Sequence, residues 1–205
     1  MRAKEAKWAL DRIEGFARPK IRHEQYKTPS ELASLATHVM AVENGDIRGK
    51  KILDVGCGTG MLSAAAMVYG ASSVVGIEID SSLREVYTKN LLTVCDEGFS
   101  FIEADVLQAP PSSCIEFDTA VVNPPFGTKS NKGIDVCFLE YALSRARVVY
   151  SMHKTSTRAY FQAKYKGRIR VVSKMLFELP RTYSFHQKET KHIEVDLIRV
   201  ESETA

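Results

Sequence analysis

The sequence has no apolar run long enough to cross a membrane, which excludes an integral membrane helix. Only four cysteines occur, at positions 57, 95, 114 and 137, and none belongs to a Cys-x-x-Cys pair. Neither a disulfide scaffold nor a zinc finger is therefore expected. Internal repeats and low-complexity tracts are absent as well. Residues 1–16 lack the apolar segment of a signal peptide, so we expect a protein that stays inside the cell.

A large excess of charge is also missing, because 28 lysines and arginines stand against 25 acidic residues, a net charge of +3. This near-balance conceals an uneven distribution. Residues 145–191 contain 12 lysines and arginines and two acidic residues, a net charge of +10, which leaves −7 for the rest of the chain. Such asymmetry favours a polyanionic partner for one face, although charges scattered over several faces are equally compatible with it.

What the sequence does contain is an alternation of short apolar runs and helical patterns. Strands are predicted at 51–55, 74–79, 100–106, 118–123, 147–152, 169–179 and 192–200. Helices are predicted at 1–14, 29–42, 61–69, 81–92 (with Ser81 as its N-cap), 135–146 and 155–165. This order predicts an α/β, Rossmann-like fold: a seven-stranded, mostly parallel sheet with helices on both faces and a C-terminal antiparallel hairpin. We expect a single domain over 1–205, in which 1–45 form a helical extension and 46–205 form the core.

A glycine-rich turn, Asp54 to Gly60, follows the first predicted strand. Its glycines, which include Gly56 and Gly58, let backbone amides approach a ligand closely. They follow the spacing D-x-G-x-G-x-G rather than the G-x-G-x-x-G of dinucleotide sites, and Met61 stands where the third glycine of that motif would fall. The acid at the start of the turn would oppose a pyrophosphate and suits a ligand that carries an amino group.

Acidic residues end the next two predicted strands as well. Glu78 can accept hydrogen bonds from both hydroxyls of a ribose, and Asp105 can accept one from an adenine amino group. Taken alone, Asp54 could be a turn cap, and Glu78 or Asp105 could be a solvated strand end. Together with Asp54 they match a nucleoside with a cationic amino-acid tail, and we expect S-adenosylmethionine as the cofactor.

The fourth predicted strand runs into Asn123-Pro124-Pro125-Phe126, the most specific motif of the sequence. The prolines fix φ and remove two amide donors, so the Asn123 side-chain oxygen and the Pro124 carbonyl can both point into a cleft. Two such acceptors suit the NH2 group of a planar amide or amidine, and Phe126 offers a flat face for stacking. The motif predicts methyl transfer to that nitrogen by in-line positioning. The alternative is a structural Pro-Pro turn with a capping Asn.

Six segments closely resemble the methyltransferase-like protein 5 family, over nearly the whole chain. They are Glu24-Gln25-Tyr26-x-Thr28, DVGCGTG at 54–60, NPPFGTKSNKGID at 123–135, SMHKTSTR at 151–158, Tyr183-x-Phe185-His186 and IEVDLIR at 193–199. The resemblance implies a class I methyltransferase fold and N6-methylation of an adenosine in small-subunit (18S) ribosomal RNA. The sequence departs from the family at Glu78 and Thr59, where members often carry Asp and Cys.

The predicted site has residues for the cofactor, for the target adenine and for RNA phosphates. The turn and the acids at the strand ends predict that the cofactor is held by Asp54, Gly56, Gly58, Gly60, Glu78 and Asp105. The family resemblance implies that the N-terminal extension contributes Gln25 and Thr28 to the same site, and that Thr59, Met61 and Val106 also line it. The target adenine is expected to be held by Asn123, Pro124, Pro125 and Phe126. RNA phosphates are expected to be bound, without readout of base sequence, by Lys129, Lys132, His153, Lys154, Arg158, Lys164, Lys166, Arg181, His186 and Lys188. For the two histidines a loop or capping role is equally compatible, and for any single lysine plain solubility is favoured.

The family resemblance further implies a heterodimer with a small zinc-binding activator protein that extends the sheet of several methyltransferases. It also implies a location in the nucleus or nucleolus and the cytoplasm. No metal site is expected in the chain itself. Three alternatives remain for the activity: guanine N2 in RNA as the acceptor, a protein glutamine as the acceptor, or a non-catalytic RNA-binding subunit that kept the fold. A nicotinamide-dependent oxidoreductase is opposed by the glycine spacing and by Asp54.

Overall fold

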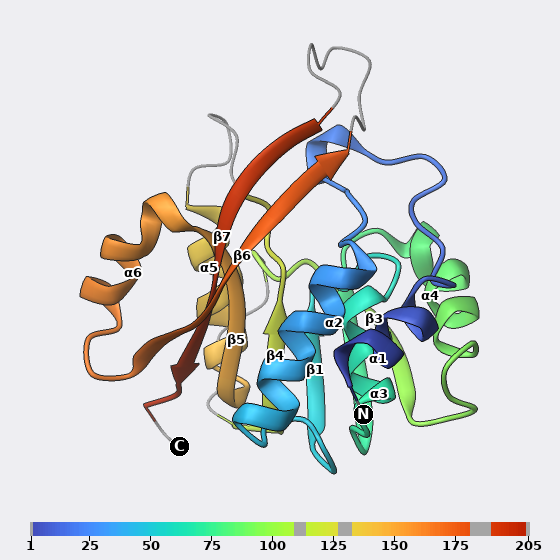
Figure 1. Ribbon diagram of the computed structural model, residues 1–205, viewed down its shortest axis with the longest axis horizontal. Helices are drawn as coiled ribbons and strands as arrows, with labels where there is room; N and C mark the ends of the chain where they lie inside the picture. The colour runs from blue at the N-terminus through green and yellow to red at the C-terminus, as the bar shows by residue number, and fades with distance from the viewer. Residues whose placement is uncertain (1, 109–113, 127–132, 181–189, 204–205) are drawn as a thin grey trace.

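A seven-stranded sheet runs through the middle of the computed structural model, which describes residues 2–108, 114–126, 133–180 and 190–203 (Figure 1). The strands are β1 (Lys51–Val55), β2 (Ser73–Glu78), β3 (Phe99–Glu103), β4 (Phe117–Val122), β5 (Ala146–Lys154), β6 (Ile169–Pro180) and β7 (Thr190–Glu201). Their order across the sheet is β3-β2-β1-β4-β5-β7-β6. The first five strands are parallel, and β7 lies antiparallel between β5 and β6. The predicted sheet and its C-terminal antiparallel hairpin are confirmed.

Helices cover both faces of this sheet, as the sequence predicts. They are α1 (Ala3–Leu10), α2 (Ser30–His38), α3 (Met61–Val68), α4 (Arg84–Leu91), α5 (Ile134–Leu143) and α6 (Arg158–Lys164). Helices α1 to α4 contribute to one buried apolar cluster, and α5 and α6 contribute to the other. Within the described part of the chain, no helix is both long enough and apolar enough to span a membrane.

The central strands explain why the sheet needs cover on both sides. All residues of β1 after Lys51 are buried, and Ile52 and Leu53 belong to opposite apolar clusters. Side chains along β7 alternate between the two faces in the same way, because Val195 contributes to the first cluster and Ile198 to the second. Strands with apolar side chains on both faces are typical of parallel sheets between two helical layers.

The segment after β2 differs in detail from its prediction. The segment 81–92, predicted as one helix, begins with a short 3-10 turn, Ser81–Leu83, and α4 begins only at Arg84. The cap of this turn is Asp80, whose Oδ1 accepts hydrogen bonds from the Ser82 amide (3.3 Å) and the Ser82 hydroxyl (2.6 Å). The prediction of Ser81 as the N-cap is therefore wrong. A carboxylate directly before the turn is a strong competing acceptor for the same amides.

Candidate functional site

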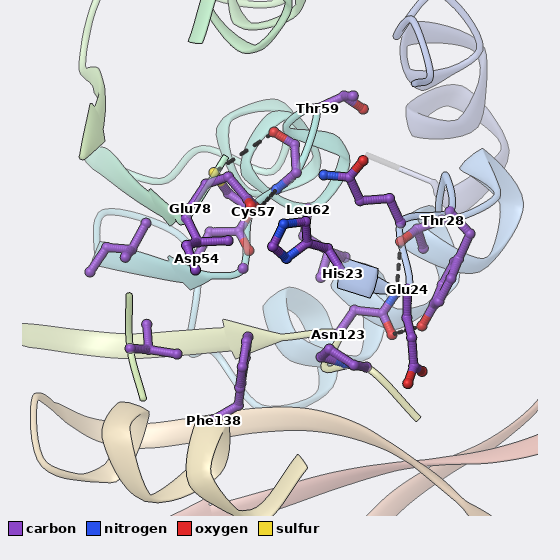
Figure 2. Close-up of a pocket in the computed structure, with 18 of the residues that line it drawn as sticks. His23, Glu24, Thr28, Asp54, Cys57, Thr59, Leu62, Glu78, Asn123 and Phe138 are labelled. Atoms are coloured by element: carbon purple, nitrogen blue, oxygen red, sulfur yellow. Dashed lines mark hydrogen bonds between the residues drawn. The ribbon is translucent and has the colours of Figure 1, made fainter. Parts of the chain in front are cut away.

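One pocket lies at the carboxyl ends of β1, β2 and β4 (Figure 2). Of the residues predicted for the site, the pocket is lined by Gln25, Thr28, Asp54, Gly56, Gly58, Thr59, Met61, Glu78, Asp105, Val106, Asn123 and Pro125. In Figure 2, Asp54 and Glu78 lie on one side of the pocket, and Thr28 and Asn123 lie on the other. Three predicted residues stand next to the lining rather than in it: Gly60, Pro124 and Phe126.

The glycine-rich turn brings backbone close to the pocket because side chains are excluded there. Gly56 and Gly58 have φ values of +74° and +52°, in the left-handed region that favours glycine. A Cβ at Gly56 would lie 2.9 Å from the Phe138 ring, and one at Gly58 would lie 2.9 Å from the Phe16 ring. The turn therefore requires glycine at both positions.

Asp54 is buried near the end of β1. Its Oδ2 accepts a hydrogen bond of 2.6 Å from the Ser63 hydroxyl of α3. Burial raises the pKa of Asp54 to about 7, against the opposing effect of the Ser63 hydrogen bonds. A buried carboxylate of this kind gains most from a ligand that brings a positive charge.

Glu78 is buried at the end of β2, and its carboxylate is held by two backbone donors. The Gly58 amide donates to Oε2 and the Asp80 amide donates to Oε1, both over 3.0 Å. Burial raises the pKa of Glu78, and these two hydrogen bonds oppose the shift. Each oxygen keeps a further lone pair, so the carboxylate is oriented and can still accept from a diol.

Asp105 lies two residues beyond the end of β3, and its carboxylate is engaged within its own turn. Oδ1 accepts a hydrogen bond from the Leu107 amide (2.9 Å), and Oδ2 accepts one from the Gln108 side chain (2.8 Å). In this structure the contacts of Asp105 are thus those of a turn cap, whereas the alternative that the sequence offered was a solvated strand end. Asp105 nevertheless lines the pocket, and its contact with an adenine stays a prediction.

The other wall of the pocket comes from residues 16–28, which we call the N-terminal strap. Asp80 anchors this strap: its Oδ1 lies 2.7 Å from Lys20 Nζ, and its Oδ2 accepts from Gln25 Nε2 over 2.9 Å. Burial alone raises the pKa of Asp80, but the hydrogen bonds from Lys20, Ser82 and Gln25 outweigh it and hold the pKa below its usual range. The Gln25 side chain, predicted to contact the cofactor, therefore also ties the strap to the core.

The strap also meets the Asn123-Pro124-Pro125-Phe126 motif. Asn123 Nδ2 donates to Thr28 Oγ1 over 2.9 Å, the contact drawn in Figure 2. Its Oδ1 is thereby turned towards the Tyr26 hydroxyl, 3.3 Å away, which also lies 3.5 Å from the Pro124 carbonyl oxygen. The two predicted acceptors thus converge on one point, and Tyr26 occupies it.

Comparisons with known proteins agree with this arrangement. Residues 33–147 match the family model of the methyltransferase small domain. The rRNA N(6)-adenosine-methyltransferase Mettl5 of Drosophila melanogaster is 43% identical, over 94% of this chain and 92% of that protein. The chain belongs to the methyltransferase-like protein 5 family. The family's METTL5 of Danio rerio is 38% identical, over 97% of this chain and 98% of that protein.

Among solved structures, a candidate RNA methyltransferase from Pyrococcus horikoshii is similar to this member of the methyltransferase-like protein 5 family along its whole length. The TM-score is 0.84 at 33% identity, and the match covers 98% of each chain. The fold is that of a class I methyltransferase, and the chain is an enzyme of that class.

The residues predicted to bind RNA divide into three groups. Lys129, Lys132, Arg181, His186 and Lys188 lie outside the described residues. His153 is only 2% exposed, and its ring lies 3.9 Å from that of Phe161, so the prediction that it contacts RNA is wrong in this structure. Burial lowers the pKa of His153, and the nearby Asp135 carboxylate opposes the shift. Strand β5 extends two residues beyond its predicted end, which places His153 under α6.

The remaining members of the predicted RNA set are mostly paired. Arg158 binds the buried Asp196 through two hydrogen bonds of 2.7 Å, and Lys164 Nζ lies 3.1 Å from a Glu140 oxygen. Lys166 is exposed. Lys154 is the one nearest the site: its Nζ donates to the Phe126 carbonyl over 3.1 Å.

Sequence reasoning missed two residues that organise the pocket. Asp80 anchors the strap, and its only signal was its position two residues after the end of β2. Tyr26 belongs to the motif Glu24-Gln25-Tyr26-x-Thr28, but nothing in that motif indicates that its hydroxyl meets the two predicted acceptors.

Proposed function

We propose that this protein transfers a methyl group from S-adenosylmethionine to N6 of an adenosine in small-subunit (18S) ribosomal RNA. The observation that carries the proposal is the convergence of two acceptors, Asn123 Oδ1 and the Pro124 carbonyl oxygen, beside a pocket that is lined by the acids of the three strand ends. Membership of a family whose relatives are named rRNA N6-adenosine methyltransferases supports the choice of adenosine.

The pocket fits the proposed cofactor in its shape and in the carboxylates that line it. The glycine cradle leaves room for a ligand against the backbone, and Asp54 offers a buried negative charge to a cationic amino-acid tail. The oriented Glu78 carboxylate suits a ribose, and Asp105 stands near the expected place of an adenine. When bound, S-adenosylmethionine supplies a methyl group activated by its sulfonium.

The two acceptors would act on the target nitrogen by position rather than by removing a proton first. Asn123 Oδ1 and the Pro124 oxygen can each accept one N–H of an exocyclic amine, which favours a pyramidal nitrogen with its lone pair free. Thr28 contributes by binding Nδ2, which directs the amide oxygen of Asn123 into the site. The amine sheds its proton after attack, so no strong general base is required and in-line placement is the main source of rate.

The proposed function is tested by mass spectrometry of small-subunit rRNA nucleosides from cells that lack the protein. We expect N6-methyladenosine to disappear from one position and to return when the intact chain is supplied. Undiminished N6-methyladenosine would refute the proposal. Loss of a methylated guanine or a methylated protein glutamine instead would assign one of the other acceptors.

Cofactor affinity is expected to fall as the pH drops below about 7. The pKa of Asp54 in the free protein is about 7, and only the ionised carboxylate attracts a cation. Protonation below that pH therefore competes with binding, and the dissociation constant rises by up to roughly tenfold per pH unit. Calorimetric titration with S-adenosylmethionine at several pH values measures the profile. Asp54→Asn should bind weakly with a flatter profile, and a wild-type profile that is flat across pH 7 would contradict the assignment.

A small zinc-binding activator protein completes the proposal, docked by strand addition along β3. This strand is one of the two edges of the sheet, and Ile102 on it is 47% exposed. Co-expression with the activator should yield a stable pair that Ile102→Glu disrupts. Leu176→Glu on the opposite edge strand, β6, is the matched control, because Leu176 is also exposed. Equal effects of both changes, or none from Ile102→Glu, would move the partner to another surface.

The same proposal places the protein where small subunits are assembled and used, in the nucleus or nucleolus and the cytoplasm. Its support is the proposed rRNA substrate. Fluorescence imaging of the tagged chain is the measurement, and accumulation in any other compartment would contradict it.

A further inference from the structure

Tyr26 stands where the proposed function requires the target amino group. Its hydroxyl donates to Asn123 Oδ1 over 3.3 Å and lies 3.5 Å from the Pro124 carbonyl oxygen. These are the two oxygens that would accept the N–H groups of an adenine. A tyrosine hydroxyl carries a single proton, so it can satisfy only one of these two acceptors at a time.

The ring of Tyr26 also stands where the target base would stack. It is nearly parallel to the Phe126 ring, with an interplanar angle of 14° and a centroid distance of 5.9 Å. A base inserted between two aromatic rings needs about 7 Å between them, twice the usual contact distance between carbon atoms. No base can therefore lie between Tyr26 and Phe126 unless Tyr26 moves.

The contacts that hold Tyr26 suit a group that is displaced. Both hydroxyl distances are at the long end for O–H···O hydrogen bonds, whose usual length is about 2.7–2.8 Å. Tyr26 belongs to the N-terminal strap, where the only regular structure is the short 3-10 turn Ile21–His23. Phe177 packs nearly perpendicular to both the Tyr26 and Phe126 rings, so it would remain as a wall when Tyr26 leaves.

We propose that Tyr26 occupies the target-base position in the substrate-free protein, with its hydroxyl as a surrogate for the N6 amino group, and that the adenine enters by displacing it. This inference rests on the proposed function, because it takes the two acceptors as the binding site of the amine. It makes Tyr26 a specificity-determining residue. Adenine offers two N–H donors for the single donor it expels, whereas a base with a carbonyl there offers none and would leave both acceptors unpaired.

The first test compares RNA binding by three proteins. Small-subunit rRNA that lacks the modification is titrated in the presence of S-adenosylhomocysteine, so that no turnover occurs. Tyr26→Phe keeps the ring and removes the competing donor, and we expect it to bind RNA about two- to tenfold more tightly, the worth of one net hydrogen bond. Tyr69→Phe is the matched control, because it removes a buried hydroxyl that bonds the Ser34 carbonyl away from the pocket, and its affinity should equal that of the wild type. Unchanged or weaker binding by Tyr26→Phe would overturn the proposal.

The second test observes Tyr26 directly. With 3-fluorotyrosine at position 26, the fluorine resonance of the free protein should report a half-buried ring stacked on Phe126, whose phenol pKa is raised by its partial burial. Adding the unmodified rRNA and S-adenosylhomocysteine should shift the resonance and bring the phenol pKa back towards its usual value. An RNA with inosine at the target position should leave the resonance in place. A resonance that adenosine RNA does not move overturns the displacement.

Methylation by the wild-type protein is measured on the same RNA in both tests. This measurement distinguishes a failure of the displacement from a failure of the proposed function. If the wild type methylates adenosine N6 but Tyr26 does not move, only the displacement is wrong. If the wild type methylates no adenosine, the proposed function is wrong, and the inference falls with it.

Discussion

Replacing Asn123 with Ala is expected to reduce methyl transfer to rRNA by at least about a hundredfold, while cofactor affinity stays within several-fold of wild type. The change removes one of the two acceptors that hold the target amine, and removal of one such preorganised partner in other active sites costs two to three orders of magnitude in rate. Cofactor binding depends instead on the acids of β1 and β2, which Asn123 does not contact. Single-turnover kinetics gives the rate, and calorimetric titration gives the affinity.

Asn44→Ala is the matched control for this variant. Asn44 also donates through its side-chain amide, to the Val39 carbonyl, but it lies outside the pocket. Its turnover should equal that of the wild type. Near-normal turnover by Asn123→Ala would eliminate the two-acceptor mechanism, and parallel losses of turnover and cofactor affinity would show that the variant disturbs the pocket as a whole.

The fold could be predicted from the sequence because its signals are local. A run such as KILDV at 51–55 must be covered on both faces, and the two prolines at 124 and 125 stop a strand wherever it lies. These constraints act over a few residues, so each strand was located to within about three residues. The glycine turn, Glu78 and Asn123 follow from the strand ends that the same signals define.

Contacts between distant segments could not be predicted in this way. Tyr26 and Asn123 are 97 residues apart, and nothing local to either shows that their side chains meet. In the sequence, His153 lies in a basic stretch, which suggests an exposed side chain. Its burial depends on how Phe161 of the following helix covers β5. Whether a side chain is buried depends on which residues from other segments pack against it, and the sequence of its own segment does not show which residues these are.

The charge of residues 145–191 is a further property whose arrangement in space could not be predicted from the sequence. Residues 145–191 carry +10 in sequence, yet several of their cations pair in space with acids from outside the segment. Pairs of this kind join Arg145 to Glu116, Arg158 to Asp196, Lys164 to Glu140, Arg168 to Glu203 and Lys174 to Glu194. Among the residues of the segment whose side chains the structure describes, Arg147, Lys154, Lys166 and Arg170 have no such partner. Any attraction for RNA from this part of the segment must rest mainly on these four, of which Lys154 donates to the Phe126 carbonyl.

Replacing Glu78 with Ala is expected to weaken cofactor binding by about a hundredfold or more. The carboxylate is expected to accept from both ribose hydroxyls, and hydrogen bonds to a charged group contribute about 1.5–3 kcal/mol each. Its loss also leaves the Gly58 and Asp80 amides without the acceptor that links the glycine turn to the end of β2. Isothermal titration with S-adenosylmethionine measures the change, and thermal melting checks that the fold persists.

Two further variants make the result specific to the carboxylate. Glu103→Ala removes an exposed acid from the end of the neighbouring strand β3 and should leave cofactor affinity unchanged. Glu78→Asp keeps the charge and both oxygens on a shorter side chain, so it should retain most of the affinity that Glu78→Ala loses. If Glu78→Ala binds the cofactor as the wild type does, Glu78 does not hold the ribose. If Glu78→Asp fails as completely as Glu78→Ala in a folded protein, the position of the carboxylate matters as much as its charge, because the two amide donors of Gly58 and Asp80 fix where it must lie.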